Sequence, residues 1–277
     1  MPELPEVEVV RRGLEKHLVG RQIRDITVLH PRPVRSHPGG PEGFAANMRG
    51  RSIDEVARRG KYLWLVLGPD AMIAHLGMSG QFRINHPSDP RLRHTRVLFD
   101  LDDGTQLRFI DQRMFGVLEF VAEGGACPVP HIARDPFDPE FDVEDVARRL
   151  RSRRTTVKRA ILDQRLISGV GNIYADESLW RAQLHGEYPT AQLAQASVVS
   201  LLEHARAVMS EALAAGGTSF DSLYVNVNGE SGYFERGLDA YGREDRPCRR
   251  CATLMVRQRF AGRSSFLCPE CQRLPRE

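Results

Sequence analysis

The chain begins Met1-Pro2-Glu3-Leu4-Pro5-Glu6-Val7-Glu8, and this stretch sets the start of the first helix. Proline suits the first turn of a helix because its missing N–H has no partner there in any case. From this point apolar residues recur at helical spacing with charged residues between them, as far as Leu18. The pattern predicts an amphipathic helix that begins almost at the N-terminus and packs its apolar face against a core.

Pro2 and Glu3 are also candidates for a catalytic role. Proline at position 2 is small enough for Met1 to be trimmed, which leaves a free secondary amine followed at once by a carboxylate. An α-amino group titrates near pH ~8, so part of it is unprotonated and nucleophilic at neutral pH. Such amines form Schiff bases with carbonyl-like carbons. Two hypotheses stay open: a catalytic terminus, or prolines that only start a helix.

The C-terminal cysteines form a second pattern. Cys248 and Cys251 make one Cys-x2-Cys pair, and Cys268 and Cys271 make another after sixteen intervening residues. This spacing is typical of a four-cysteine zinc site. Disulfides are the alternative, but we expect no signal peptide, and reduced cytosolic thiols favour one structural zinc ion. The fifth cysteine, Cys127, is expected to be a free thiol.

Between the two cysteine pairs the sequence predicts a β-hairpin. Two β-prone runs flank Ala261-Gly262-Arg263, which places Arg263 near the hairpin tip. Residues 241–277 contain nine Arg against four acidic residues, whereas the whole chain has a net charge of +3. A zinc-pinned hairpin with a basic surface is suited to phosphates or a nucleic-acid groove. The alternative is a zinc ribbon that only stabilises the C-terminus.

Length and composition predict an α+β protein of more than one domain. The chain has 277 residues, 41% of them hydrophobic, and no apolar run approaches the ~20 residues of a membrane span. We predict an N-terminal antiparallel β-sandwich domain at 1–125, a linker at 126–139, a helical domain at 140–240 and a zinc finger at 241–277. The linker is assigned because it has four prolines in fourteen residues.

The first domain is predicted to be one helix followed by short strands. Those strands are expected at 21–29, 51–58, 61–67, 71–76, 81–84, 94–101, 106–110 and 117–121. After the linker, helices are expected at 142–150, 157–163, 173–182 and 192–215. Gly169-Val170-Gly171-Asn172 is predicted to be a turn that opens one of these helices, where free N–H groups can hold a phosphate.

Lysine is rare in this chain. Of 39 basic residues only Lys16, Lys61 and Lys158 are lysine. A lysine kept among arginines suggests a place for a compact, deprotonatable ammonium. Lys158 also lies in a basic run from Arg148 to Arg159, for which a solvated helix face is the simpler interpretation.

Several ordered motifs together resemble bacterial formamidopyrimidine-DNA glycosylase. They run essentially end to end and comprise residues 1–8, Arg-Gly-Lys-Tyr-Leu at 59–63, His-Leu-Gly-Met-Ser-Gly at 75–80, Asp-x-Arg-x-Phe-Gly at 111–116, Gly-Val-Gly-Asn-Ile-Tyr-Ala at 169–175, Gly-Gly-Thr-Ser at 216–219, Gly-Tyr-Phe at 232–234, Tyr-Gly-Arg at 241–243 and the four cysteines with Gly-Arg-Ser-Ser-Phe at 262–266. The resemblance implies a β-sandwich, a helix–two-turn–helix domain and a zinc finger. It also implies a monomeric cytoplasmic enzyme that excises oxidised purines from double-stranded DNA and then cleaves the strand by β,δ-elimination.

The resemblance assigns catalytic roles to four residues. Pro2 is expected to attack C1′ of the damaged nucleotide and form an iminium, and Glu3 to protonate the opening sugar ring as a general acid. Lys61 matches the lysine of the first elimination, and Arg263 the arginine of the second.

The resemblance also assigns DNA contacts. His94, Arg113 and Arg154 match DNA-contacting positions, although the family often has lysine at the position of Arg154. The phosphate contacts around the lesion are assigned to His75, Lys158 and Asn172. The gap left by the extruded nucleotide is assigned to Met78, Arg113 and Phe115, as base flipping requires. The loop over the flipped base is expected at Phe220–Glu230.

Two alternative functions remain beside this one. An endonuclease VIII type enzyme, which removes oxidised pyrimidines, has the same Pro-Glu start, but Leu4, Met78, Arg113 and Phe115 favour the purine-lesion branch. A zinc-ribbon DNA-binding protein without catalysis is the other. The combination of Pro2, Glu3 and Lys61 speaks against it, because a protein that only binds DNA needs no nucleophilic terminus.

Overall fold

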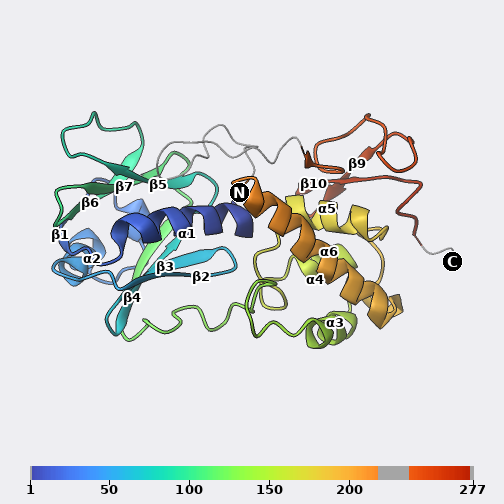
Figure 1. The fold of residues 1–277 in the computed structure, drawn as a ribbon, viewed down its shortest axis with the longest axis horizontal. Helices are drawn as coiled ribbons and strands as arrows, with labels where there is room; N and C mark the ends of the chain where they lie inside the picture. The colour runs from blue at the N-terminus through green and yellow to red at the C-terminus, as the bar shows by residue number, and fades with distance from the viewer. Residues whose placement is uncertain (1, 218–236, 275–277) are drawn as a thin grey trace. The chain divides into compact units, whose positions relative to one another are not determined.

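The computed structural model describes residues 2–217 and 237–274, and the expected loop at 220–230 lies outside them. The described residues form two compact units, one of 2–130 with 216–217 and the other of 131–215 with 237–274 (Figure 1). The α+β class predicted from the sequence is confirmed.

The first unit contains two four-stranded antiparallel sheets. One has the order β1-β6-β7-β5 and the other β2-β3-β4-β8. The strands are β1 (Ile23–Val28), β2 (Glu55–Arg59), β3 (Tyr62–Leu67), β4 (Asp70–His75), β5 (Gly80–Asn85), β6 (Thr95–Leu101), β7 (Gln106–Asp111) and β8 (Val117–Val121). Each of them overlaps one of the eight strands predicted from the sequence.

The core of this unit is built from alternate residues of the strands. Leu63 and Leu65 of β3 and Phe99 of β6 are almost fully buried and belong to one hydrophobic cluster. Helix α1 (Leu4–Leu18) completes that cluster through Val7, Val10, Leu14 and Leu18, and it packs on β2 and β3. The period of two in the strands and the period near 3.6 in the helix therefore direct their apolar faces to one interior.

The prediction of a single helix in the first domain is wrong. A second helix, α2 (Gly40–Met48), packs on β1 and β8, and a short 3-10 turn, η1 (Arg32–Val34), precedes it. This segment is rich in proline and glycine, which disfavour a helix interior. Pro41, however, lies in the first helical turn, where proline is tolerated, and burial of Phe44 and Met48 stabilises the helix.

The second unit is helical and ends in a hairpin. Its elements are α3 (Val143–Arg151), α4 (Val157–Ile161), α5 (Asn172–Arg181), η2 (Thr190–Gln192), α6 (Gln195–Ala214), β9 (Val256–Phe260) and β10 (Arg263–Leu267). Each of the four predicted helices overlaps an observed one. The long helix α6 packs on α3 and α5, and α5 also contacts β10.

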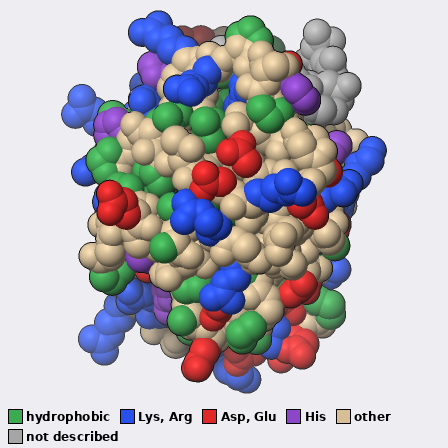
Figure 2. Space-filling model, turned by 90° about the vertical axis from the view of Figure 1, so that its left-hand side faces the viewer, with side chains coloured by type: hydrophobic (Ala, Val, Ile, Leu, Met, Phe, Trp, Pro, Cys, Tyr) green, Lys and Arg blue, Asp and Glu red, His purple; other side chains and the backbone are tan. Residues whose placement is uncertain are grey.

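The segment between the two units has no regular structure. No helix or strand lies between Val121 and Val143, where the prolines are concentrated. On the face shown in Figure 2, acidic and basic side chains are interspersed. Ion pairs between partly exposed side chains of the first unit include Arg49–Asp25 and Arg21–Asp103. Among the described residues, no helix is both long and apolar enough to cross a membrane.

Candidate active site, DNA-contacting loops and metal centre

The N-terminal residues are buried at the start of α1. Pro2 is buried, and Glu3, directly before the helix, has only 3% of its surface exposed. The backbone N–H of Glu3 donates to the Glu6 carboxylate at 2.9 Å, and its carbonyl accepts from Val7 N–H. These bonds fix the first helical turn, so the residue that follows Pro2 is held in one conformation.

Lys61 lies in the tight turn between β2 and β3. Arg59 pairs with Tyr62 across the hairpin, and Gly60 has φ 57°, the left-handed conformation that two-residue hairpin turns require. Lys61 is 7% exposed. Its side chain is therefore largely shielded from solvent.

A salt bridge joins α1 to this turn. The Arg58 guanidinium donates to the Glu8 carboxylate at 2.9 Å and to the Gly60 carbonyl at 3.0 Å. Burial opposes ionisation of Glu8, but hydrogen bonds from Arg11 and Arg58 outweigh it and lower the pKa of Glu8. Glu8 and Arg58 were not predicted as site residues, because a pairing across fifty residues leaves no local signal.

His75, at the end of β4, is a neutral imidazole beside Lys61. Burial, and then the charge of Lys61, lower the pKa of His75 from 6.5 to about 4. Its Nδ1 accepts from the Gly77 N–H at 3.2 Å, so the proton is on Nε2, which is left to donate. The ring also packs against that of Tyr62, its cross-strand partner, with the ring centroids 4.7 Å apart and the planes tilted by 48°. His75 can thus offer an N–H to an anion without being charged.

Met78, Arg113 and Phe115 lie on two adjacent loops. Met78 is half-buried between β4 and β5, whereas Arg113 and Phe115 are exposed between β7 and β8. Phe115 is 50% exposed, and the Arg113 guanidinium lies 5.5 Å from the centre of its ring. An exposed phenylalanine capped by an arginine has the form expected of side chains that enter a base stack.

His94 lies at the end of the loop between β5 and β6. Its φ of 67° is unusual for a residue with a side chain. Its Nδ1 accepts from Arg96, and its carbonyl accepts from the Asp111 N–H. Because a guanidinium can only donate, Nδ1 of His94 is the acceptor and Nε2 carries the ring proton.

The predicted contacts in the second unit have different surroundings. Arg154 is exposed in the turn between α3 and α4. Asn172 begins α5 and donates from Nδ2 to the Ser264 carbonyl at 2.8 Å, while its Oδ1 is buried without a hydrogen-bond partner among the described residues. Asn172 therefore contacts the hairpin that carries Arg263.

Lys158 is fully buried, which corrects the prediction that it grips a phosphate. Its ammonium donates to Asp176 at 2.5 Å and to the Ser265 hydroxyl at 2.7 Å, and it lies 4.6 Å from the centre of the Phe260 ring. The same Asp176 carboxylate accepts the Phe266 N–H. Lys158 therefore holds the hairpin against α4 and α5, within the protein.

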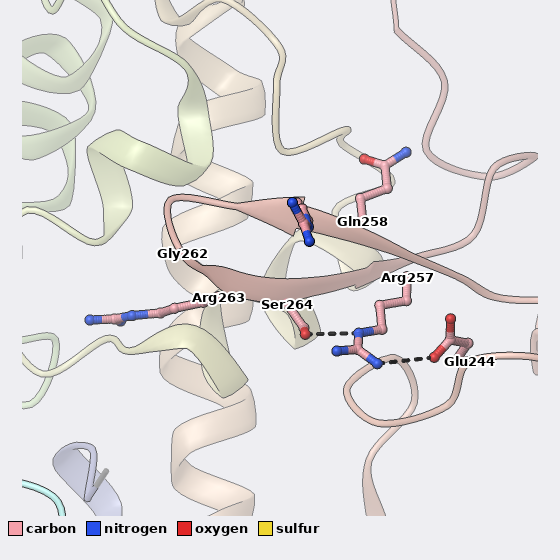
Figure 3. Close-up of a pocket in the computed structure, with 7 residues that line it drawn as sticks. Glu244, Arg257, Gln258, Gly262, Arg263 and Ser264 are labelled. Atoms are coloured by element: carbon pink, nitrogen blue, oxygen red, sulfur yellow. Dashed lines mark hydrogen bonds and ion pairs between the residues drawn. The ribbon is translucent and has the colours of Figure 1, made fainter.

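Arg263 is exposed as the first residue of β10, directly after the turn Ala261-Gly262. Both turn residues have positive φ, 45° and 76°. Figure 3 shows Arg263 projecting from one end of the hairpin, while Arg257 lies between Ser264 and Glu244. An open hollow of about 630 Å³ is lined there by Glu244, Arg257, Gln258, Arg259, Gly262, Arg263 and Ser264.

The four finger cysteines fit a zinc ion. Their sulfur atoms all lie within 4.8 Å of one another, and Cys251 Sγ is 3.4 Å from Cys268 Sγ. A tetrahedral zinc with Zn–S near 2.3 Å separates sulfurs by about 3.8 Å. The same 3.4 Å is too long for a disulfide bond, so the disulfide alternative is wrong and Cys127 is also free.

Hydrogen bonds around the sulfurs suit thiolate ligands. The Trp180 indole N–H and the Arg250 N–H each donate to Cys248 Sγ at 3.4 Å, and the Cys271 N–H donates to Cys268 Sγ. Such donors orient metal ligands and stabilise their negative charge. One zinc ion is the cofactor that this donor set accommodates, with a structural role.

Comparison with protein families covers nearly the whole chain. Residues 1–118 match the formamidopyrimidine-DNA glycosylase N-terminal domain, and residues 132–223 match its H2TH domain. Residues 246–274 match the zinc finger found in FPG and IleRS. The three matches follow one another along the chain and leave residues 119–131 and 224–245 between them.

Individual relatives are similar over their full length. A formamidopyrimidine-DNA glycosylase of Nocardioides is 59% identical, with 100% of this chain and 96% of the relative covered. The crystal structure of Lactococcus lactis Fpg with DNA containing an abasic site has a TM-score of 0.88 at 34% identity, covering 98% of this chain and 99% of that one. MutM bound to DNA containing carbocyclic 8-oxo-G has a TM-score of 0.88 at 33% identity, covering 98% and 100%.

His75 predicts a specific pH dependence of stability. Its pKa is about 4 in the folded chain and near 6.5 when unfolded, so the unfolded chain binds more protons between these values. The free energy of unfolding should therefore fall as the pH decreases through this window. A His75→Gln variant lacks this term. Urea unfolding of both proteins should show a stability difference that changes below pH ~6.5; a constant difference would contradict the burial of a neutral imidazole.

The metal centre predicts one zinc ion per chain in the purified protein. Cys268→Ser should lose the metal, and chelation should do the same to the parent, because such sites contribute about 10–16 kcal/mol of apparent binding energy to folding. Release should alter the fluorescence of Trp180, whose indole contacts Cys248. Cys127→Ser is the matched control and should retain zinc. Elemental analysis that finds no zinc in the parent would refute the assignment.

Proposed function

The chain belongs to the formamidopyrimidine-DNA glycosylase family, and we propose that it excises oxidised purines through Pro2 and then cleaves the strand at the abasic site. It is an enzyme of base-excision repair, with damaged double-stranded DNA as its substrate. We propose that it acts as a monomer in the cytoplasm. The sandwich, helical and finger regions, at 1–125, 140–240 and 241–277, are proposed as its domains.

The observation that carries the mechanism is that Pro2 and Glu3 are buried directly before α1. Once Met1 is removed, Pro2 is a secondary amine beside the shielded Glu3 carboxylate. In the proposed first step the amine nitrogen attacks C1′, the bond from C1′ to the base breaks, and the base leaves with the proton that the amine gives up. Glu3 donates a proton to the sugar ring oxygen as the ring opens, and an iminium joins Pro2 to C1′.

Two cations serve the eliminations that follow. Lys61, held at the hairpin turn by the Glu8–Arg58 bridge, is proposed to transfer the proton for the first elimination. A largely buried lysine beside neutral His75 is suited to give and take a proton. Arg263, exposed at the hairpin, is proposed to serve the second elimination.

The remaining residues are proposed to bind DNA. His75 offers its Nε2–H to a phosphate, and Arg154 offers an exposed charge. Asn172, at the start of α5, is proposed as a further phosphate contact. The stack vacated by the flipped nucleotide is proposed to be filled by Met78, Arg113 and Phe115, and His94 is a further contact. An 8-oxoguanine or formamidopyrimidine is the proposed lesion class, since the family and its DNA complexes carry those names.

Covalent trapping tests the nucleophile. Borohydride should reduce the iminium and join the protein to duplex containing an abasic site or oxidised guanine, and mass mapping should place the link on Pro2. A variant that retains Met1 should not trap. Glu3→Gln should slow base excision by about 100-fold or more, since general acids contribute roughly 10²–10⁴, yet still trap a preformed abasic site. An adduct on Lys61 with Pro2 free would overturn the mechanism.

The salt dependence of DNA affinity distinguishes a residue that contacts phosphate from one that fills the gap in the base stack. Arg154→Ala should weaken binding to damaged and undamaged duplex by similar factors, and flatten the slope of log K against log salt by about one unit. Arg113→Ala should weaken binding mainly to damaged duplex, with a smaller change in slope. Binding isotherms at several salt concentrations measure both. Equal weakening of both duplexes by Arg113→Ala would make Arg113 a phosphate contact.

A further inference from the structure

We infer that Ser79 and Asp111 are positioning residues for the gap-filling side chains. Their buried hydroxyl–carboxylate pair joins the loop that carries Met78 to the loop that carries Arg113 and Phe115. The inference rests on the proposed function of those three side chains. The inference adds the contact that holds the two loops in place, so that the three side chains are oriented for DNA.

The contacts of the pair reach each gap-filling residue through the backbone. Ser79 Oγ donates to Asp111 Oδ1 at 2.6 Å and accepts the Arg113 N–H at 2.9 Å. Asp111 Oδ2 accepts the Gly116 N–H at 2.7 Å. Ser79 directly follows Met78, and Gly116 directly follows Phe115. Every gap-filling residue is therefore bonded by the pair or adjacent to a residue that is.

Because the pair is buried, its hydrogen bond is strong, and removal of either partner is costly. Ser79 is 3% exposed and Asp111 is fully buried. Hydrogen bonds to an ionised carboxylate are short and roughly twice as strong as neutral ones. If the Ser79 hydroxyl is removed, a buried carboxylate oxygen and the Arg113 N–H both lose a partner, which water cannot easily replace.

The backbones of the two loops are also in direct contact at a glycine. A Cβ added to Gly77, whose φ is 61°, would lie 2.6 Å from the Phe115 carbonyl carbon. A Cβ on Gly116 would lie 2.7 Å from the Phe109 ring and 2.9 Å from Asp111 Oδ2. The glycines thus permit the close approach that the hydroxyl–carboxylate pair then fixes.

The two loops are anchored by buried groups, whereas the side chain proposed to enter the DNA is exposed. Phe115 projects from the loops at 50% exposure, whereas the pair beneath it is buried. Arg35 adds a further bond from beneath, donating to the Gly116 carbonyl at 2.9 Å. Side chains that must enter a base stack bind more tightly when their loops are already ordered, because less conformational entropy is lost on binding.

Ser79→Ala tests the inference. We expect excision of oxidised guanine from duplex to fall about tenfold, the effect of one buried hydrogen bond lost. Trapping on a single-stranded oligonucleotide with an abasic site should not change, because that substrate has no base stack to fill and still reaches Pro2. Thr105→Ala is the matched control: it removes a hydroxyl–carboxylate bond to Asp103 beside the opposite end of β7, and both activities should persist.

The outcomes distinguish a positioning role from a general effect on folding. Equal loss of both activities in Ser79→Ala would make the pair merely structural, and loss of neither would show that it positions nothing; either result overturns the inference. Phe115→Ala separates it from the proposed function. If Phe115→Ala leaves duplex excision unchanged, gap filling itself is wrong. If Phe115→Ala lowers excision and Ser79→Ala does not, only the positioning role fails.

Discussion

The constraint on which the first unit depends is that the start of α1 is held in one conformation. A terminus ordinarily frays, because its backbone has few partners. Here the helix begins two residues later, the Glu6 carboxylate accepts the Glu3 N–H, and the far end of α1 is fixed in the core by Leu14 and Leu18. Burial of one helix face thus supplies the rigidity that the nucleophile proposed at position 2 requires.

Polar pairs then place the other functional groups on that scaffold. The Glu8–Arg58 bridge ties the Lys61 turn to α1, and the Ser79–Asp111 pair ties two loops together. Both pairs combine buried or half-buried groups that are costly to leave unpaired, which makes each arrangement well defined. Exposed ion pairs such as Arg49–Asp25 lack this property and contribute little.

Periodicity and turn chemistry were enough to predict most of the fold. Eight strands, the helices of the second unit and the zinc-binding cysteines follow from local patterns, as does the hairpin turn at Ala261-Gly262. Helix α2 was missed because its Pro-Gly composition is overridden by burial of Phe44 and Met48. Pairs such as Ser79 with Asp111 could not be predicted, since thirty-two residues separate them and only the sheet register brings them together.

For Lys158, the residue type predicted the kind of group that the site needs but not the partner of that group. Its rarity among arginines suggested a place for a compact ammonium, and the surroundings agree. Nζ fits between the Asp176 carboxylate, the Ser265 hydroxyl and the Phe260 ring. A planar guanidinium with five donors would leave several N–H groups unpaired in that space. Burial raises the pKa of Asp176, and the ammonium opposes that shift. The need for a lysine at position 158 could therefore be inferred from residue chemistry. The anion that it binds could not, because packing determines whether the ammonium meets a phosphate or a carboxylate of the chain itself, and no local pattern records that packing.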